Sequence, residues 1–74
     1  MTETITIKGD FIKLDALMKF ASLVASGGEA KMAIADGLVS VNGEVCTMRG
    51  KKIRPGDKVS FCGQDLAVQS YDHP

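Results

Sequence analysis

Four basic side chains lie close together in the second half of the chain, and no acidic residue interrupts them: Arg49, Lys51, Lys52 and Arg54. Unpaired Lys and Arg are almost never fully buried, so we expect all four to face solvent. An arginine can fork onto phosphate oxygens, and a lysine supplies a point charge. The segment therefore predicts a phosphate-contacting surface. The alternative is a solvated loop that keeps the domain soluble.

A second basic position follows the start of a predicted helix. Ser26 and Glu29 have the spacing of a capping box, in which each side chain satisfies a free backbone donor of the first turn. A helix N-terminus beside Lys31 can hold a phosphate. On Gly27, Gly28 and Lys31 alone we favour the alternative, in which the cap already occupies those donors and Glu29 repels an anion.

Catalytic and metal-binding chemistry is poorly supported. The one histidine, His73, is next to last, and we expect it to be an exposed terminal residue. Cys46 and Cys62 are far apart in the sequence, and no internal histidine could serve them as a base. We expect the protein to be reduced and both cysteine side chains to be buried as small hydrophobic groups. No glycine-rich phosphate loop is present. We predict a protein that is not an enzyme, with no catalytic residues, metal or cofactor.

The length and charge of the chain restrict the classes further. Its 74 residues allow one domain, and the formal net charge of +0 counts against a strong non-specific nucleic-acid binder. The average hides an asymmetry, because residues 31–58 hold six basic and three acidic residues. We find no signal peptide or membrane-spanning run, and we expect a cytoplasmic protein.

Hydrophobic spacing predicts the elements of the first half. Residues 4–7 alternate as in a strand, and apolar residues then recur at helical spacing: Leu14, Leu17, Met18 and Ala21. Lys13 and Lys19 fall off that stripe. A second helix begins at Ser26 and ends at Gly37, which can take the positive φ of a helix C-terminus. The two helices share a short joint, so we expect them to pack together.

The period changes to two after the second helix. Val39 and Val41 predict a strand, and Asn42-Gly43 is a strong signal for a type I′ hairpin turn. Residues 48–54 are predicted to form an exposed connection, which is followed by a type II turn at residues 55–56. Two further strands are predicted around residues 59–61 and 66–68, and a turn at residues 63–64 joins them. We expect the phenylalanines in the core, which leaves no base-stacking surface and favours structured RNA held by shape and phosphates: Phe11, Phe20 and Phe61.

Several ordered segments together resemble the alpha-L RNA-binding domain, which is named after the fourth ribosomal small-subunit protein: residues 13–15, the helix of residues 26–37, residues 39–43 and residues 55–59. The likeness covers roughly residues 12–68. The familiar motif has one Arg directly after the serine that begins the second helix and a second Arg four residues after the first. This chain has Gly27 and Lys31 at these two positions. The form Ser26 to Lys31 is similar to that of small stand-alone bacterial members, the YbcJ/YaaA-like group.

We therefore expect an α+β fold, the alpha-L RNA-binding fold, with two packed helices on a small, mostly antiparallel sheet. Residues 1–74 form one domain, with a core at about 4–68 and a flexible tail at 70–74. The resemblance implies RNA binding through Lys31, the hairpin after Val41 and the basic loop from Arg49, and it does not name the RNA. We expect a non-enzymatic, ribosome-associated bacterial protein that is a monomer and binds structured RNA, either ribosomal or transfer RNA. The expected RNA-binding residues lie on the helix-strand corner and the following loop: Lys13, Lys19, Ser26, Lys31, Asn42, Gly43, Arg49, Lys51, Lys52 and Arg54.

Two alternatives stay open. Zero net charge allows a protein–protein adaptor of a ribosome-assembly or RNA-modifying complex instead of an RNA binder. A scaffold role for Ser26 and Gly43 is at least as well supported as direct contact with RNA.

Overall fold

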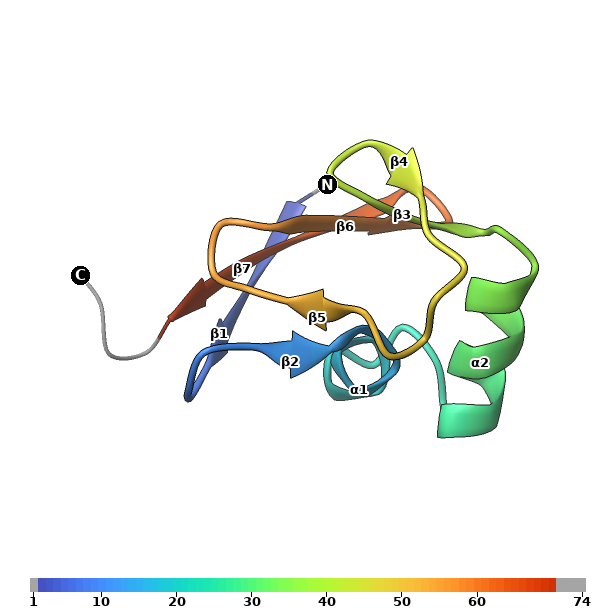
Figure 1. The fold of residues 1–74 in the computed structure, drawn as a ribbon, viewed down its shortest axis with the longest axis horizontal. Helices are drawn as coiled ribbons and strands as arrows, with labels where there is room; N and C mark the ends of the chain where they lie inside the picture. The colour runs from blue at the N-terminus through green and yellow to red at the C-terminus, as the bar shows by residue number, and fades with distance from the viewer. Residues whose placement is uncertain (1, 71–74) are drawn as a thin grey trace.

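The protein consists of a five-stranded sheet, a separate two-stranded ribbon and two helices (Figure 1). The computed structural model describes residues 2–70. The strands of the large sheet lie in the order β1-β7-β6-β3-β4, and β2 pairs with β5 to form the ribbon. The elements in chain order are β1 (Thr2–Ile7), β2 (Ile12–Lys13), α1 (Leu14–Phe20), α2 (Gly27–Ala35), β3 (Val39–Val41), β4 (Glu44–Val45), β5 (Lys52–Ile53), β6 (Lys58–Phe61) and β7 (Gln64–Ser70).

The large sheet has one apolar and one polar face. Ile5 pairs with Val68 in the parallel β1–β7 pair, while Val59 lies between Leu66 and Val41 in antiparallel pairs. All five side chains are buried, because alternate residues of a strand point to the same face. On the polar face the Ser60 hydroxyl donates to Asp65 Oδ1 at 2.7 Å. The predicted α+β fold with a mostly antiparallel sheet is confirmed, with β1–β7 as the parallel exception.

The two helices pack against each other, and α1 also contacts both strands of the ribbon (Figure 1). Leu14, Leu17 and Met18 of α1 are fully buried, as their helical spacing predicts. The buried stripe of α2 includes Ala30 and Ala33, whose small side chains let the two helices pack closely. Burying one large apolar side chain contributes roughly 1.5–3 kcal/mol, so these stripes hold the helices on the core.

The prediction that all three phenylalanines lie in the core is wrong for two of them. Phe11 is 40 % exposed and Phe20 is 63 % exposed, while Phe61 is half-buried against the core. Phe20 is on the flank of the buried stripe of α1, and Phe11 points outward because its neighbour Ile12 points inward. The helix and strand periods therefore place both rings at the surface.

The thiols and the last turn also differ from expectation. Cys46 packs half-buried against the core, but Cys62 is exposed. Cys62 and Gly63, with φ of 50° and 80°, form the turn between β6 and β7, one residue earlier than predicted. Ser70 belongs to β7, and the rest of the predicted tail, with His73, lies outside the described residues. Within residues 2–70, neither helix has the length and apolar character that crossing a membrane requires.

Candidate nucleic-acid interface

The β2–β5 ribbon turns a row of charged side chains toward solvent. Ile12 pairs with Ile53, which is fully buried, and Lys13 pairs with Lys52, which is exposed. The predicted exposed connection over residues 48–54 is therefore wrong in part, because it contains the short strand β5. Alternation places the exposed neighbours of the two isoleucines on the outer side. We call this set the cationic ribbon face: Phe11, Lys13, Lys52 and Arg54.

Two lysines occupy directly opposite positions on this face. Lys13 and Lys52 are paired across the antiparallel ribbon, an arrangement that is unfavourable for equal charges. The Lys52 ammonium lies 4.9 Å from the centroid of the Phe11 ring, and this cation–π contact offsets part of the repulsion. An anion bound between the two lysines would relieve the rest.

The loop before β5 is fixed by main-chain hydrogen bonds to the start of α1. Lys13, the N-cap residue of α1, makes no side-chain capping bond. Instead Leu14 N donates to the carbonyl of Lys51 at 2.9 Å, and Asp15 N donates to the carbonyl of Arg49 at 3.2 Å. These bonds satisfy donors that the first turn of a helix leaves free. The loop is therefore held by its backbone, while the exposed side chains of Arg49 and Lys51 remain available to a ligand.

Asn42 joins two turns beside the ribbon. Asn42 and Gly43 have φ of 52° and 87°, which confirms the predicted turn between β3 and β4. Asn42 Nδ2 donates to Asp57 Oδ1 at 3.1 Å, and Lys58 N donates to Asn42 Oδ1 at 2.9 Å. The side chain of this predicted RNA-binding residue is thus engaged in holding the structure, and Gly43 supplies the positive φ that the turn requires.

Asp57 is the carboxylate that orders the turn before β6. Its Oδ2 accepts a hydrogen bond from Arg54 N at 2.9 Å. This bond lowers the pKa of Asp57, and the Asn42 hydrogen bond and the charges of Lys51 and Arg54 lower it further, against a partial desolvation that raises it. The charged carboxylate therefore lies within the electrostatic reach of both cations and helps to fix the backbone at Arg54.

The start of α2 forms the predicted cap with one difference. Glu29 N donates to Ser26 Oγ at 3.3 Å, but the Glu29 carboxylate accepts from Ala25 N at 3.4 Å and not from the nitrogen of Ser26. Ser26 is thereby engaged in the cap. Lys31 and Lys19 are exposed on α2 and α1, on different elements from the ribbon.

Two shallow hollows meet at the ribbon and share Lys52 and Arg54. One has a volume of about 600 Å³ and extends past Phe11 toward Asp10 and Pro55. The other, of about 500 Å³, extends past Lys51 toward Met48 and Asp57. The two cations therefore stand on a ridge between depressions, where a ligand can contact them from both sides. In the part of the chain that the structure describes, no cluster of His, Cys, Asp and Glu could hold a metal ion.

Sequence reasoning missed the exposed rings and found most of the cations. Of the predicted residues, the structure places five on the ribbon or its docked loop: Lys13, Arg49, Lys51, Lys52 and Arg54. The sequence gives no usable signal for the strand pairing. Residues 11–13 and residues 52–54 each place one isoleucine between two outward residues, and three residues are too few to show a period.

Comparison with known proteins also indicates an RNA-binding domain. A family model described as the S4 domain matches residues 5–69. The chain is 41% identical over 61 residues to "Putative RNA-binding protein YbcJ" of Escherichia coli (strain K12), covering 82% of this chain and 87% of that protein. It is 36% identical over 63 residues to "Probable ribosome maturation protein RlbA" of Bacillus subtilis (strain 168), covering 85% of this chain and 89% of that protein.

A solved structure agrees with these sequence relatives. The solution structure of YbcJ from Escherichia coli, described as revealing an alpha-L motif involved in RNA binding, superposes with a TM-score of 0.66 and 38% sequence identity. The match covers 92% of this chain and 85% of that one. The predicted resemblance to the alpha-L domain and to its small bacterial members is confirmed.

Proposed function

Because this chain belongs to the S4 domain family, we propose that it is a non-enzymatic protein that binds structured RNA on the cationic ribbon face and its docked loop. The contacts that we propose are from Lys13, Arg49, Lys51, Lys52 and Arg54 to phosphates. Lys19 and Lys31 would lie at the margin, and Ser26, Asn42 and Gly43 would shape the surface without contact. The ligand class that fits best is ribosomal or transfer RNA.

The observation that carries this proposal is the opposition of Lys13 and Lys52 on a ribbon whose neighbouring loop is fixed by backbone bonds. Double-stranded RNA is recognised mainly through its shape and its phosphates, because side chains cannot read its deep, narrow major groove. A rigid set of cations matches that kind of recognition. The entropy that the loop backbone loses on binding is also smaller when that backbone is already fixed.

The names of the relatives support a place near the ribosome. One is named for RNA binding and another for ribosome maturation. We infer that this chain acts as a monomer on ribosomal RNA or on a precursor of the ribosome, in the bacterial cytoplasm.

One observation favours the second candidate function, a protein–protein adaptor. Four large apolar side chains outside the ribbon are strongly exposed: Met32, Leu38, Val45 and Met48. The end of α2 lies near β4, since Val45 Cγ1 is 3.6 Å from the position that a Cβ on Gly37 would take. Such a surface can contact a protein while the ribbon holds RNA.

Salt dependence of binding tests the RNA proposal. Fluorescently labelled total ribosomal RNA and total transfer RNA would be titrated with the purified protein over a series of KCl concentrations. Five phosphate contacts predict a slope of about −4 in a plot of log affinity against log salt. Absence of binding at low salt, or a slope near zero, would overturn the proposal and leave the adaptor function.

A further inference from the structure

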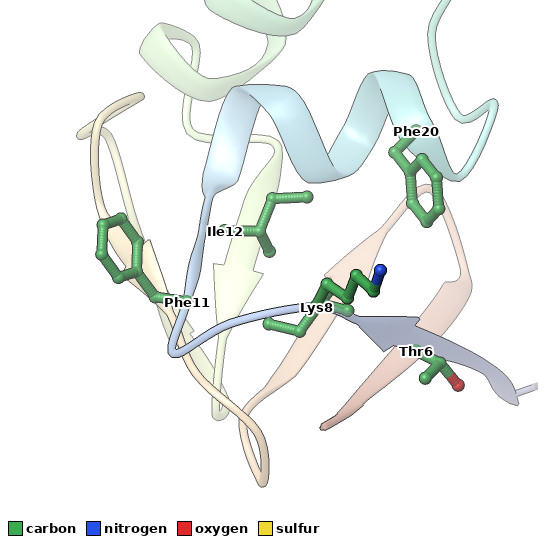
Figure 2. Close-up of a pocket in the computed structure, with 6 residues that line it drawn as sticks. Thr6, Lys8, Phe11, Ile12 and Phe20 are labelled. Atoms are coloured by element: carbon green, nitrogen blue, oxygen red, sulfur yellow. The ribbon is translucent and has the colours of Figure 1, made fainter. Parts of the chain in front are cut away.

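An apolar hollow of about 560 Å³ opens between the end of β1 and the helix α1 (Figure 2). Both exposed phenylalanines line it, and Ile7 and Ile12 contribute further apolar surface. A single exposed apolar side chain is ordinary, but here the open ring of Phe20 adjoins a hollow with further apolar lining, and Phe11 lies at its margin with the ring turned outward (Figure 2). This site is separate from the hollows that flank Lys52 and Arg54, although Phe11 is common to it and one of them.

The two rings are not equivalent. Figure 2 shows Phe20, from the last turn of α1, at one end of the hollow and Phe11 at the other, with Ile12 between them. One face of Phe11 is occupied by the ammonium group of Lys52, at 4.9 Å from the ring centroid. Phe20 is 63 % exposed, so most of its surface is open to a ligand. Phe20 therefore offers the more open ring, and Phe11 lies at the end of the hollow nearest Lys52.

Positive charge within the hollow and at its Phe11 end indicates what occupies it. Lys8 lines the hollow itself, and Lys52 lies over Phe11 at the end that adjoins the cationic ribbon face. A suitable ligand has a flat apolar group with an anion on each side. A nucleotide in an RNA strand has this form, since its base lies between two phosphates. Aromatic side chains interleaved with cations are the usual device for binding unpaired nucleotides.

We propose that this hollow receives one unpaired base of the bound RNA, stacked on Phe20, with Lys8 and Lys52 holding the phosphates on either side. The inference rests on the proposed RNA-binding function and adds a feature of the RNA that this function does not specify. The protein reads a junction, in which a duplex on the ribbon face adjoins a bulged or looped nucleotide. A fully paired RNA of the same sequence contacts the cationic ribbon face and leaves the hollow empty.

Three hairpin RNAs test this inference with the intact protein. All three share one duplex sequence. The first hairpin is fully paired, the second has a bulged 2-aminopurine at one position, and the third has an abasic bulge at the same position. The wild-type protein is expected to bind the 2-aminopurine bulge about 5- to 100-fold more tightly than the other two, the range for stacking one base on an aromatic side chain. The fluorescence of 2-aminopurine is expected to change on binding.

Phe20→Leu supplies the matched variant, because it keeps an apolar side chain and removes the ring. It is expected to lose the preference for the bulge and the fluorescence change, while its affinity for the paired hairpin stays at the wild-type value. Phe20 is largely exposed, so the melting temperature should stay near that of the wild type. The abasic comparison uses the wild-type protein and remains decisive if the variant fails to fold.

The outcomes separate this inference from the function on which it rests. Equal affinity of the wild-type protein for all three hairpins, with a steep salt dependence, overturns the base pocket and leaves RNA binding intact. It would assign the hollow to a protein partner. A bulge preference that Phe20→Leu retains also overturns the pocket. Failure to bind any hairpin in a salt-dependent manner overturns both proposals.

Discussion

Lys13 and Lys52 face each other directly across the β2–β5 ribbon, with their Cα atoms in register. Between charges of equal sign this pairing costs free energy in the unbound protein, and the ring of Phe11 beside Lys52 compensates only in part. A bound phosphate would turn the same repulsion into two attractions. On the proposed function, relief of this repulsion would contribute to the binding free energy.

Replacing Lys51 and Lys52 together by Glu is expected to abolish binding to structured RNA. Both side chains are exposed, so the melting temperature should stay nearly unchanged. Fluorescence anisotropy with labelled RNA gives the affinity, and calorimetry gives the melting temperature. The single variants Lys52→Glu and Lys58→Glu form a matched pair, because Lys58 is an exposed lysine on β6, outside the ribbon. Unchanged affinity in the double variant, or equal losses in the matched pair, would argue against the ribbon as the binding surface.

Asn42→Gly is expected to lower the free energy of unfolding by about 1–3 kcal/mol, since Lys58 N and Asp57 each lose a hydrogen-bonding partner. Asn42→Ala should cost about 1 kcal/mol more, because alanine is disfavoured at a φ of 52°. Urea denaturation measures both. If Asn42 is a scaffold residue, the folded variants bind RNA almost as the wild type does. A large loss of affinity without a loss of stability would instead make it a contact residue.

Acid unfolding should report the environment of Asp57. The hydrogen bond from Arg54 N, with the other contacts, holds its pKa below the ordinary value of 3.8. The unfolded chain then binds a proton more readily, so this stabilisation is complete above the unfolded pKa and is lost as the pH falls through the folded pKa. Asp57→Asn is expected to reduce the difference in unfolding free energy between about pH 6 and about pH 3.

The same acid measurement on Asn42→Gly gives an internal control. This variant removes the hydrogen bond from Asn42 and retains the one from Arg54, which has the larger effect on the pKa of Asp57. Its pH dependence should lie between those of the wild type and Asp57→Asn. An Asp57→Asn protein that loses stability in acid as steeply as the wild type would refute the assignment.

Gly27→Arg is expected to strengthen RNA binding. It restores the arginine that the familiar form of the motif has after the first serine of the second helix. A Cβ at Gly27 meets no atom within 4 Å, and the position lies in the first turn of α2, so a side chain fits there without strain. One added phosphate contact should steepen the salt slope by about one. Gly27→Ala separates the effect on the helix from the effect of the charge, and equal salt slopes for the two variants would exclude a contact.

Sequence patterns predicted the parts of this fold that depend on local chemistry. The Ser26 side of the cap, the turn at Asn42-Gly43 and the buried stripe of α1 each follow from a few neighbouring residues, and the structure confirms them. The return bond from Glu29 differs, since it goes to Ala25 N. The run of cations was visible for the same reason. Its exposure follows from the cost of burying charge.

The pairing of residues 12–13 with residues 52–53 was not predictable in that way. It joins segments that are distant in the sequence, and each strand is too short to show an alternation. The exposure of Phe11 and Phe20 depends on that pairing and on the packing of α1, so large apolar side chains were assigned to the core by their type alone. Neither the opposed lysines nor the aromatic hollow could be inferred without the tertiary structure.

The bonds from Leu14 and Asp15 to the carbonyls of Lys51 and Arg49 have a consequence for how such a surface can evolve. Every amino acid carries a main-chain carbonyl, so exchanging the side chains at positions 49 and 51 leaves the first turn of α1 with the same hydrogen bonds. The loop can acquire or lose charge, and with it a preference for one ligand over another, while the architecture beneath it is inherited unaltered. Selection can retune what this domain recognises without first having to rescue its folding.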